Sequence, residues 1–155
     1  MVVLRGPTTP QSHRQQFLSG FEQMCNMPRQ IVLDSDGLKM KFSGLKHFET
    51  LETEFDVPYA EMSSVSTEIF DFPTGTYRFG GVRIPFTDIR EGHFEWQGHW
   101  YFVSFEDSEK VVTIYLKNFV HKGRHYSVVA FQVDNPEDFV EKLLELAPHI
   151  KRVQP

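Results

Sequence analysis

The chain has 155 residues, 16 basic and 21 acidic side chains for a formal net charge of −5, and one cysteine, Cys25. This length fits one domain with an appendage. The excess of acidic side chains argues against a nucleic-acid or anionic-membrane partner. A single cysteine excludes an internal disulfide. One cysteine also suits a reducing compartment. No stretch reaches the ~20 apolar residues of a membrane span or carries the apolar core of a secretion signal. The expected location is therefore the cytoplasm.

The first 28 residues differ from the rest of the chain. Residues 5–12 consist largely of Gly, Pro, Thr and Ser, which predicts a loop. Residues 13–27 carry apolar side chains at roughly helical spacing, with Ser12 as a candidate N-cap. Three interpretations stay open: this segment docks on the domain, it pairs with another chain, or the native chain starts at Met24 or Met27.

From residue 30 onward the pattern is that of short β-strands. Apolar and polar residues alternate between Leu38 and Phe42, which gives one buried and one solvated face. The 15 phenylalanines suit a β-rich core. The predicted strands are residues 31–33, 38–42, 52–57, 63–70, 76–79, 82–86, 91–96, 99–105, 111–116 and 126–133. Residues 45–51 fit a helical turn and a bent strand equally well, and residues 59–62 fit one helical turn.

Turn-forming residues separate these strands. Asp34-Ser35-Asp36-Gly37 and Gln97-Gly98 predict tight turns, since Gly accepts the backbone angles that such turns require. Gly80-Gly81 inside a strand-like stretch predicts a bulge or a sharp bend. We expect residues 106–110 and 117–125 to form loops.

A well-capped helix is predicted over residues 135–147. Asn135 can cap the free amides, and Pro136 suits the first helical position, where its missing N–H costs no hydrogen bond. The apolar face consists of Phe139, Val140, Leu143, Leu144 and Leu146. Many strands followed by one such helix predict a mainly β (α+β) roll or barrel with the helix packed over one opening. Residues 29–148 form the predicted domain, between an extension (1–28) and a tail (149–155).

Five segments, in their order along the chain, resemble the bacterial pleckstrin-homology-like domains. They are residues 37–45, 55–65, 78–85, 110–116 and 133–140. The resemblance covers about residues 30–147. It implies about seven or more antiparallel strands in two near-orthogonal sheets, with the last helix plugging one end. It implies no common chemistry, because such domains mostly bind proteins, peptides or lipids.

Phosphoinositide binding is not expected at the site that the resemblance would suggest. Pleckstrin-homology domains that bind these lipids use basic residues around the first hairpin loop. Here that loop is Asp34-Ser35-Asp36-Gly37, whose two carboxylates repel phosphate.

Enzymatic and metal chemistry find little support in the sequence. There is no Gly-x-Ser-x-Gly elbow, no cysteine in a catalytic context and no phosphate-binding loop. The histidine pairs His121/His125 and His93/His99 lack a Cys or acidic partner at a diagnostic spacing, so we expect solvated loop histidines. No catalytic residue, cofactor or metal is predicted.

Two basic clusters and two tryptophans are the candidate binding residues. Arg78, Arg83 and Arg90 surround the glycine bend, and Lys122 and Arg124 lie with Lys117, His121 and His125 in the expected loop 117–125. Trp96 and Trp100 flank the Gln97-Gly98 turn and serve either as interface anchors or as core. The sequence therefore favours a non-enzymatic module that binds a protein partner or self-associates. The alternative is a lipid or small-ligand carrier that uses the barrel interior or its mouth.

Overall fold

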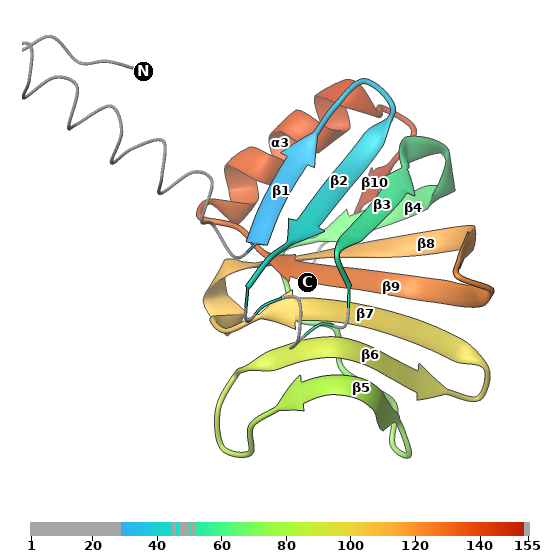
Figure 1. Cartoon of the computed structure of the whole chain (residues 1–155). Helices are drawn as coiled ribbons and strands as arrows, with labels where there is room; N and C mark the ends of the chain where they lie inside the picture. Colours follow the sequence, from blue (N-terminus) through green and yellow to red (C-terminus); the bar gives the residue numbers. More distant parts are fainter. Residues whose placement is uncertain (1–28, 45, 47–49, 51, 154–155) are drawn as a thin grey trace, which may run out of the picture.

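Two β-sheets and a C-terminal helix make up the part of the chain that the computed structural model describes, residues 29–44, 46, 50 and 52–153 (Figure 1). The smaller sheet has the order β1 (Arg29–Leu33), β2 (Gly37–Phe42), β3 (Glu54–Pro58). The larger sheet has the order β10-β4-β8-β9-β7-β6-β5. Its strands are β4 (Met62–Ser66), β5 (Tyr77–Arg83), β6 (Arg90–Trp96), β7 (His99–Phe105), β8 (Val111–His121), β9 (Arg124–Gln132) and β10 (Lys151–Arg152). The helix is α3 (Pro136–Leu146), and η1 (Tyr59–Glu61) and η2 (Ser108–Lys110) are single 3-10 turns.

The predicted mainly β class, with two sheets and one C-terminal helix, is confirmed. We had expected every strand pair to be antiparallel, and this prediction is wrong in two places: β7 pairs with β9, and β10 with β4, in parallel. The β8–β9 hairpin lies between β7 and β4, so its second strand runs in the same direction as β7. In the part of the chain that the structure describes, the strands also do not close into a barrel: the larger sheet ends at β10 and β5, and the smaller at β1 and β3. The predicted extension 1–28 lies outside the described residues.

Strand boundaries differ most from prediction in two places. Residues 117–125 are not a loop: β8 and β9 continue as a long hairpin that turns at Lys122 and Gly123, whose φ angles are 50° and 78°. A bulge between Tyr115 and Phe119 interrupts the β8–β9 register. The alternation of apolar and polar residues is therefore broken there, so the sequence pattern did not indicate that the strand continues. The predicted strand 63–70 ends early, since β4 stops at Ser66.

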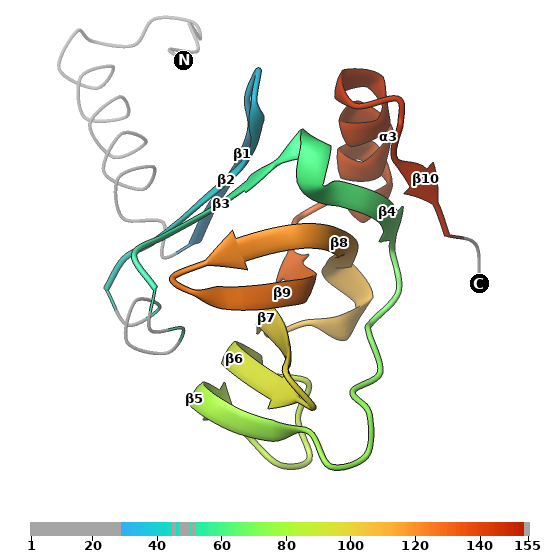
Figure 2. The same cartoon turned by 90° about the vertical axis from the view of Figure 1, so that its right-hand side faces the viewer.

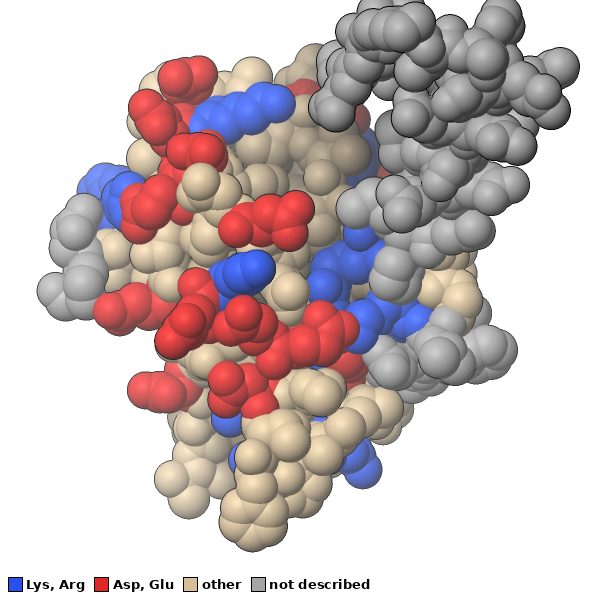
Figure 3. All heavy atoms as spheres, turned by 90° about the vertical axis from the view of Figure 1, so that its left-hand side faces the viewer, with Lys and Arg blue, Asp and Glu red and all other residues tan. Residues whose placement is uncertain are grey.

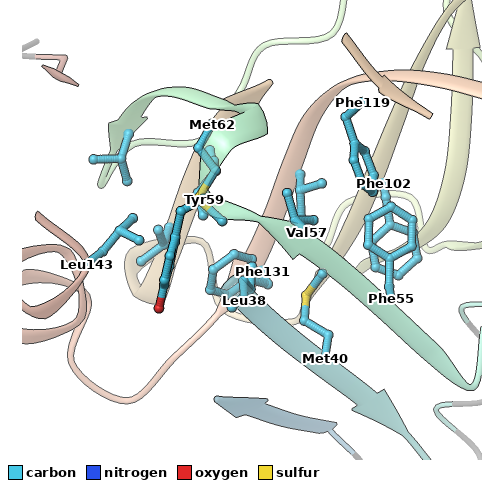
Figure 4. Close-up of a cluster of buried hydrophobic side chains, with 14 of the residues drawn as sticks. Leu38, Met40, Phe55, Val57, Tyr59, Met62, Phe102, Phe119, Phe131 and Leu143 are labelled. Atoms are coloured by element: carbon cyan, nitrogen blue, oxygen red, sulfur yellow. The ribbon is translucent and has the colours of Figure 1, made fainter. Parts of the chain in front are cut away.

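The main core lies between the two sheets and α3 (Figure 4). Leu38 and Val57 of the smaller sheet face this space, as do Phe102 and Phe131 of the larger one, and all are almost fully buried. The rings of Phe55 and Phe102 stack across the interface with their centroids 4.3 Å apart. Burial of this layer stabilises the fold by about 25 cal/mol per Å² of apolar surface removed from water.

The terminal helix forms as predicted. The Asn135 side chain accepts a hydrogen bond from the Asp138 amide at 3.2 Å, and Pro136 is its first residue. Val140 and Leu143 are buried, whereas Leu146 is 45% exposed and lies off the apolar face.

Residues 149–153 are not a tail outside the domain. Ile150 is buried, and β10 pairs with β4, because hydrogen bonding there satisfies the otherwise unpaired edge of β4. In the described residues, no helix is long and apolar enough to cross a bilayer.

A second, smaller core lies on the other face of the larger sheet. After β4 the chain descends along this face before it enters β5 (Figure 2). Phe70 and Phe72 of this connection pack on the sheet, with Phe72 stacked on Phe94 at 4.8 Å and Phe70 against Tyr101 at 4.9 Å between ring centroids. This connection and β5 form the two walls of the candidate site.

Candidate functional site

Strand β5 is the outermost strand of the larger sheet, and two glycines shape it. Gly81 and Gly92 lie opposite each other in β5 and β6, with φ angles of 115° and 117°. A side chain at Gly81 would collide with the Glu91 carbonyl oxygen, so only glycine allows this close approach of the two strands. The register also shifts between Arg78 and Gly80. The predicted bulge at Gly80-Gly81 is therefore confirmed, and it curves the edge of the sheet.

The curved edge borders an open groove of about 990 Å³ that is lined by all three arginines of the first predicted cluster. We name it the arginine groove. Its described lining residues are Asp71, Phe72, Pro73, Gly75, Thr76, Arg78, Arg83, Pro85, Phe86, Arg90 and Phe94. One wall is the connection from β4 to β5, and the other is β5 with the β5–β6 turn.

Positive charge in the arginine groove is poorly compensated. Arg83 and Arg90 are direct cross-strand partners, an arrangement of like charges that destabilises a sheet. Burial, together with repulsion from Arg83, lowers the pKa of Arg90, while Asp88 and Asp71 act in the opposite direction. The Arg90 guanidinium carbon lies 5.3 Å from the centre of the Phe72 ring, which adds a cation–π contact. A cluster that repels itself is what an anion-binding site requires.

The two main residues of the second predicted cluster, Arg124 and Lys122, have different partners in the structure. Arg124 lies between two aromatic rings, 4.4 Å from the centre of Phe79 and 4.3 Å from that of Trp100. Phe79 was not among the candidate residues predicted from the sequence. Its position next to Arg78 on a predicted strand, which places the two side chains on opposite faces, could have indicated it. Lys122 instead forms an ion pair with Glu52 at 2.9 Å. Arg124 and Trp100 are thus brought together, and Lys122 is not part of their stack.

The two faces of β5 therefore carry different chemistry. Arg78 pairs with Phe94, a member of the second core, and faces the arginine groove. Phe79 points the other way and meets Trp100, which packs against the main core. Trp96 is held on the groove side, where its indole N–H donates to the Thr74 carbonyl oxygen at 3.1 Å.

A buried ion cluster that the sequence did not indicate holds β6 from its inner face. The carboxylate of Glu91 is fully buried and lies 2.8 Å from Arg29 Nη2 and 2.6 Å from Lys46 Nζ. Both cations also pair with Glu106, and Arg29 Nε donates to Ser104 Oγ at 2.7 Å. Burial raises the pKa of Glu91; at Glu106 burial acts the same way, but Lys46 and Arg29 outweigh it and lower the pKa. The cluster fixes the strand that carries Arg90.

A second buried cluster contains histidines that we had expected to be solvated in loops. His93 is buried, and its Nε2 lies 3.3 Å from Glu52 Oε1, while His121 Nε2 lies 3.2 Å from the same oxygen. The Tyr126 hydroxyl lies 2.7 Å from His93 Nδ1. Burial opposes ionisation of Glu52, but hydrogen bonds from His121, His93 and Lys122 outweigh it and hold the pKa well below its ordinary value. The expectation failed for His93 and His121, because β6 and the long hairpin carry these side chains inward, whereas His99 and His125 are exposed as expected.

Acidic side chains gather elsewhere on the surface. Figure 3 shows them on the face formed by the β7–β8 connection and the start of α3. Glu109, Asp134, Glu137 and Asp138 are exposed there. The net charge of −5 thus belongs largely to another part of the surface and does not describe the arginine groove.

No metal site emerges from the described ranges, where no group of three or more His, Cys, Asp or Glu side chains is placed to hold a metal ion. Comparison with family models, with curated proteins and with solved structures finds no significant match for this chain. Its function must therefore be inferred from the chemistry of β5 and the arginine groove.

Proposed function

We propose that this protein is a non-enzymatic, cytoplasmic interaction module in which β5 pairs with an extended, acidic segment of a protein partner. The observation that supports it most directly is the coincidence of an unpaired sheet edge with a self-repelling arginine cluster. Main-chain hydrogen bonds along β5 would supply affinity, and side-chain contacts on its two faces would supply specificity.

The outer edge of β5 has the properties of a strand-addition site. β5 has seven residues and a hydrogen-bonded neighbour on one side only, β6, within the described part of the chain. Of the eight large hydrophobic side chains exposed in this part, four lie on β5 or directly after it: Tyr77, Phe79, Ile84 and Phe86. The opposite edge, β10, has two residues and offers little to a partner.

Phe86 adds a candidate anchor for the partner. It is fully exposed, lines the arginine groove and has a φ of 63°, a left-handed backbone that costs a bulky residue on the order of 1–3 kcal/mol. Phenylalanine and arginine are both enriched in the buried centres of protein–protein interfaces. A bound partner would cover this ring and remove its apolar surface from water, which favours binding.

An enzymatic role finds less support than binding. Tyr126, His93 and Glu52 form a hydrogen-bonded series of the kind that activates nucleophiles. Yet Tyr126 is 3% exposed, and burial raises the pKa of its phenol to about 12. A hydroxyl that is both shielded and hard to ionise is a poor nucleophile, so we assign this series to structural stability.

The pleckstrin-homology-like classification remains part of the proposal. Two crossing sheets with a helix packed over their shared core are in keeping with it (Figure 1). The alternative of a carrier that holds a lipid between the sheets is disfavoured, because Phe55, Phe102 and Phe131 fill the space where such a ligand would lie.

The proposal is tested by peptide display followed by hydrogen exchange. A random 12-residue peptide library is selected on the immobilised protein, and amide exchange is measured with and without an enriched peptide. We expect acidic sequences and new protection of those β5 amides that do not bond to β6, because an added strand would accept their hydrogen bonds. Protection at β1 or β3 alone, or no selected peptide, would contradict the proposal. Competition by the protein itself would indicate self-association instead.

A further inference from the structure

We propose that the arginine groove is a seat for a phosphate monoester, so that the partner segment is bound in its phosphorylated form. This inference rests on the proposed function for the identity of the ligand, a phosphopeptide. The seat itself is argued from the side chains of the groove.

The first argument is charge balance. The described lining contributes three arginines and one carboxylate, Asp71, hence a net charge of 3 − 1 = +2. The nearby Asp88 does not line the groove and is exposed to solvent, although its charge still acts on Arg90. A carboxylate side chain would bring one negative charge, whereas a phosphate monoester brings about 1.5 to 2 at neutral pH. The dianion therefore matches the excess charge of the lining residues better.

The second argument is geometry. Arg83 and Arg90 lie directly opposite each other on adjacent strands, so their side chains start from neighbouring backbone positions. Each guanidinium presents N–H groups in a planar fork, and a phosphate offers three oxygens between two such forks. A single carboxylate has two oxygens and is satisfied by one fork. The paired arginines are thus better suited to share a phosphate.

The third argument is that the site is held in place before a ligand arrives. Arg90 packs over Phe72, which is stacked on Phe94. The neighbouring residue, Glu91, is clamped from the other face by Arg29 and Lys46. The side chain of Arg90 therefore loses less conformational entropy on binding than a free surface arginine.

A membrane surface is a weaker candidate for the same chemistry. A bilayer is much wider than the groove, so it would also meet the exposed acidic residues Asp88 and Glu109, which repel an anionic surface. A short phosphorylated segment meets much less of this field, because its charge is concentrated at one side chain.

The experiment is an NMR titration of the full chain that follows the arginine Nε–Hε signals. The probes are three blocked tripeptides, acetyl-Val-Xaa-Val-amide, in which Xaa is serine, glutamate or phosphoserine, together with inorganic phosphate. We expect phosphoserine to bind about tenfold more tightly than glutamate, with the largest shifts at Arg83 and Arg90. Its affinity should rise from pH 5 to 7.5, as the phosphate gains its second charge, while glutamate binding stays level.

Matched variants show whether the groove is responsible. Arg83→Gln and Arg90→Gln should each reduce phosphoserine binding about tenfold. Arg152→Gln, which removes an arginine paired with Glu137 at the far edge of the sheet, should leave it unchanged. Melting temperatures near that of the parent chain show that the variants fold.

Each outcome separates this inference from the proposed function. Equal affinity for glutamate and phosphoserine, or phosphoserine binding that survives Arg83→Gln, overturns the phosphate seat and leaves strand addition standing. Phosphate binding by a protein on which no peptide protects β5 would overturn strand addition instead. Vesicles of phosphatidylcholine with and without a phosphoinositide form a separate arm, and tighter binding to the phosphoinositide vesicles than to the phosphopeptide overturns the choice of ligand.

Discussion

At the scale of single residues, the protein buries charged side chains away from water and pairs them with groups from distant parts of the chain. Glu91 and Glu52 are both buried, and each meets at least two cationic or imidazole groups. Removing one partner of a buried pair is costly because the remaining group stays desolvated. The arginine groove is the contrasting case: its described lining holds three arginines and one carboxylate, and two of the arginines, Arg83 and Arg90, are cross-strand partners.

Glu52 makes stability depend on pH, with a sign that follows from its pKa. Its pKa lies well below the ordinary value of 4.5 in the folded state. The stabilisation is therefore fully present above about pH 4.5 and is lost as the pH falls through the folded-state value. At pH 7 we expect Glu52→Gln to lower the free energy of unfolding by about 1.5–3 kcal/mol, the range for hydrogen bonds to a charged group. Urea denaturation measures this loss.

The same variant gives a pH-dependent signature. The difference between Glu52→Gln and the parent chain should shrink as the pH falls from 4.5 toward 2, because the carboxyl group is then protonated in the unfolded parent chain while it stays ionised in the folded one. Glu54→Gln is the control, since Glu54 is exposed on β3. A difference that stays constant over this range would rule out the charge on Glu52 as the cause.

At the scale of elements, the shape of the β5–β6 pair depends on two facing glycines. Gly81 has a φ of 115°, and a Cβ there would clash with the Glu91 carbonyl oxygen and lie 2.7 Å from Gly92 Cα. Both obstacles are backbone atoms, which cannot move without shifting β6. We therefore expect Gly81→Ala to cost about 3 kcal/mol or more, from backbone strain and steric overlap together. Thermal unfolding measures the cost.

Gly123→Ala is the matched control for this prediction. Gly123 also has a positive φ, of 78°, but nothing lies within 4 Å of a Cβ built there. Only the backbone strain remains, so we expect a loss of about 1 kcal/mol. Similar losses for both variants would mean that the β5–β6 bend can relax, and the arginine groove would then be less rigid than argued above.

At the scale of the whole molecule, the last residues close the fold. Ile150 is 4% exposed in the main core, His149 Nε2 lies 2.9 Å from the Tyr59 carbonyl oxygen, and the Val153 amide donates to Val65 at 2.8 Å. These contacts tie the segment after α3 to η1 and β4. The domain therefore extends through at least residue 153 rather than ending at 148.

Ile150→Ala tests this extension. The change leaves a cavity in the main core, so we expect a loss of about 2–5 kcal/mol in the free energy of unfolding. Val153→Ala, at a side chain that is 42% exposed, should cost less than about 1 kcal/mol. Chemical denaturation of both variants decides the point, and a loss at Ile150 no larger than that at Val153 would place residues 149–153 outside the cooperative unit.

Features that depend on local sequence were predicted well. Residues 135–147 contain their own cap, proline and apolar face, and the Gln97-Gly98 turn needs φ values that the sequence can supply, 49° and 84° in the structure. The first basic cluster was also found, because Arg78, Arg83 and Arg90 lie on two strands joined by one short turn. In each case the interacting residues are close along the chain, so period and turn chemistry suffice.

Features that depend on distant residues were not predicted. Arg29 meets Glu91 and Glu52 meets His93 across separations of 62 and 41 positions, and no local pattern records such pairs. The stack of Arg124 on Phe79 and Trp100 and the parallel pairing of β7 with β9 have the same origin. The sequence by itself determined the β-rich class, the capped helix and the glycine bend, because short-range sterics and hydrogen bonds govern them. Only the tertiary structure decided which charges are buried together and which sheet edge stays open, because both depend on how the strands are ordered in space.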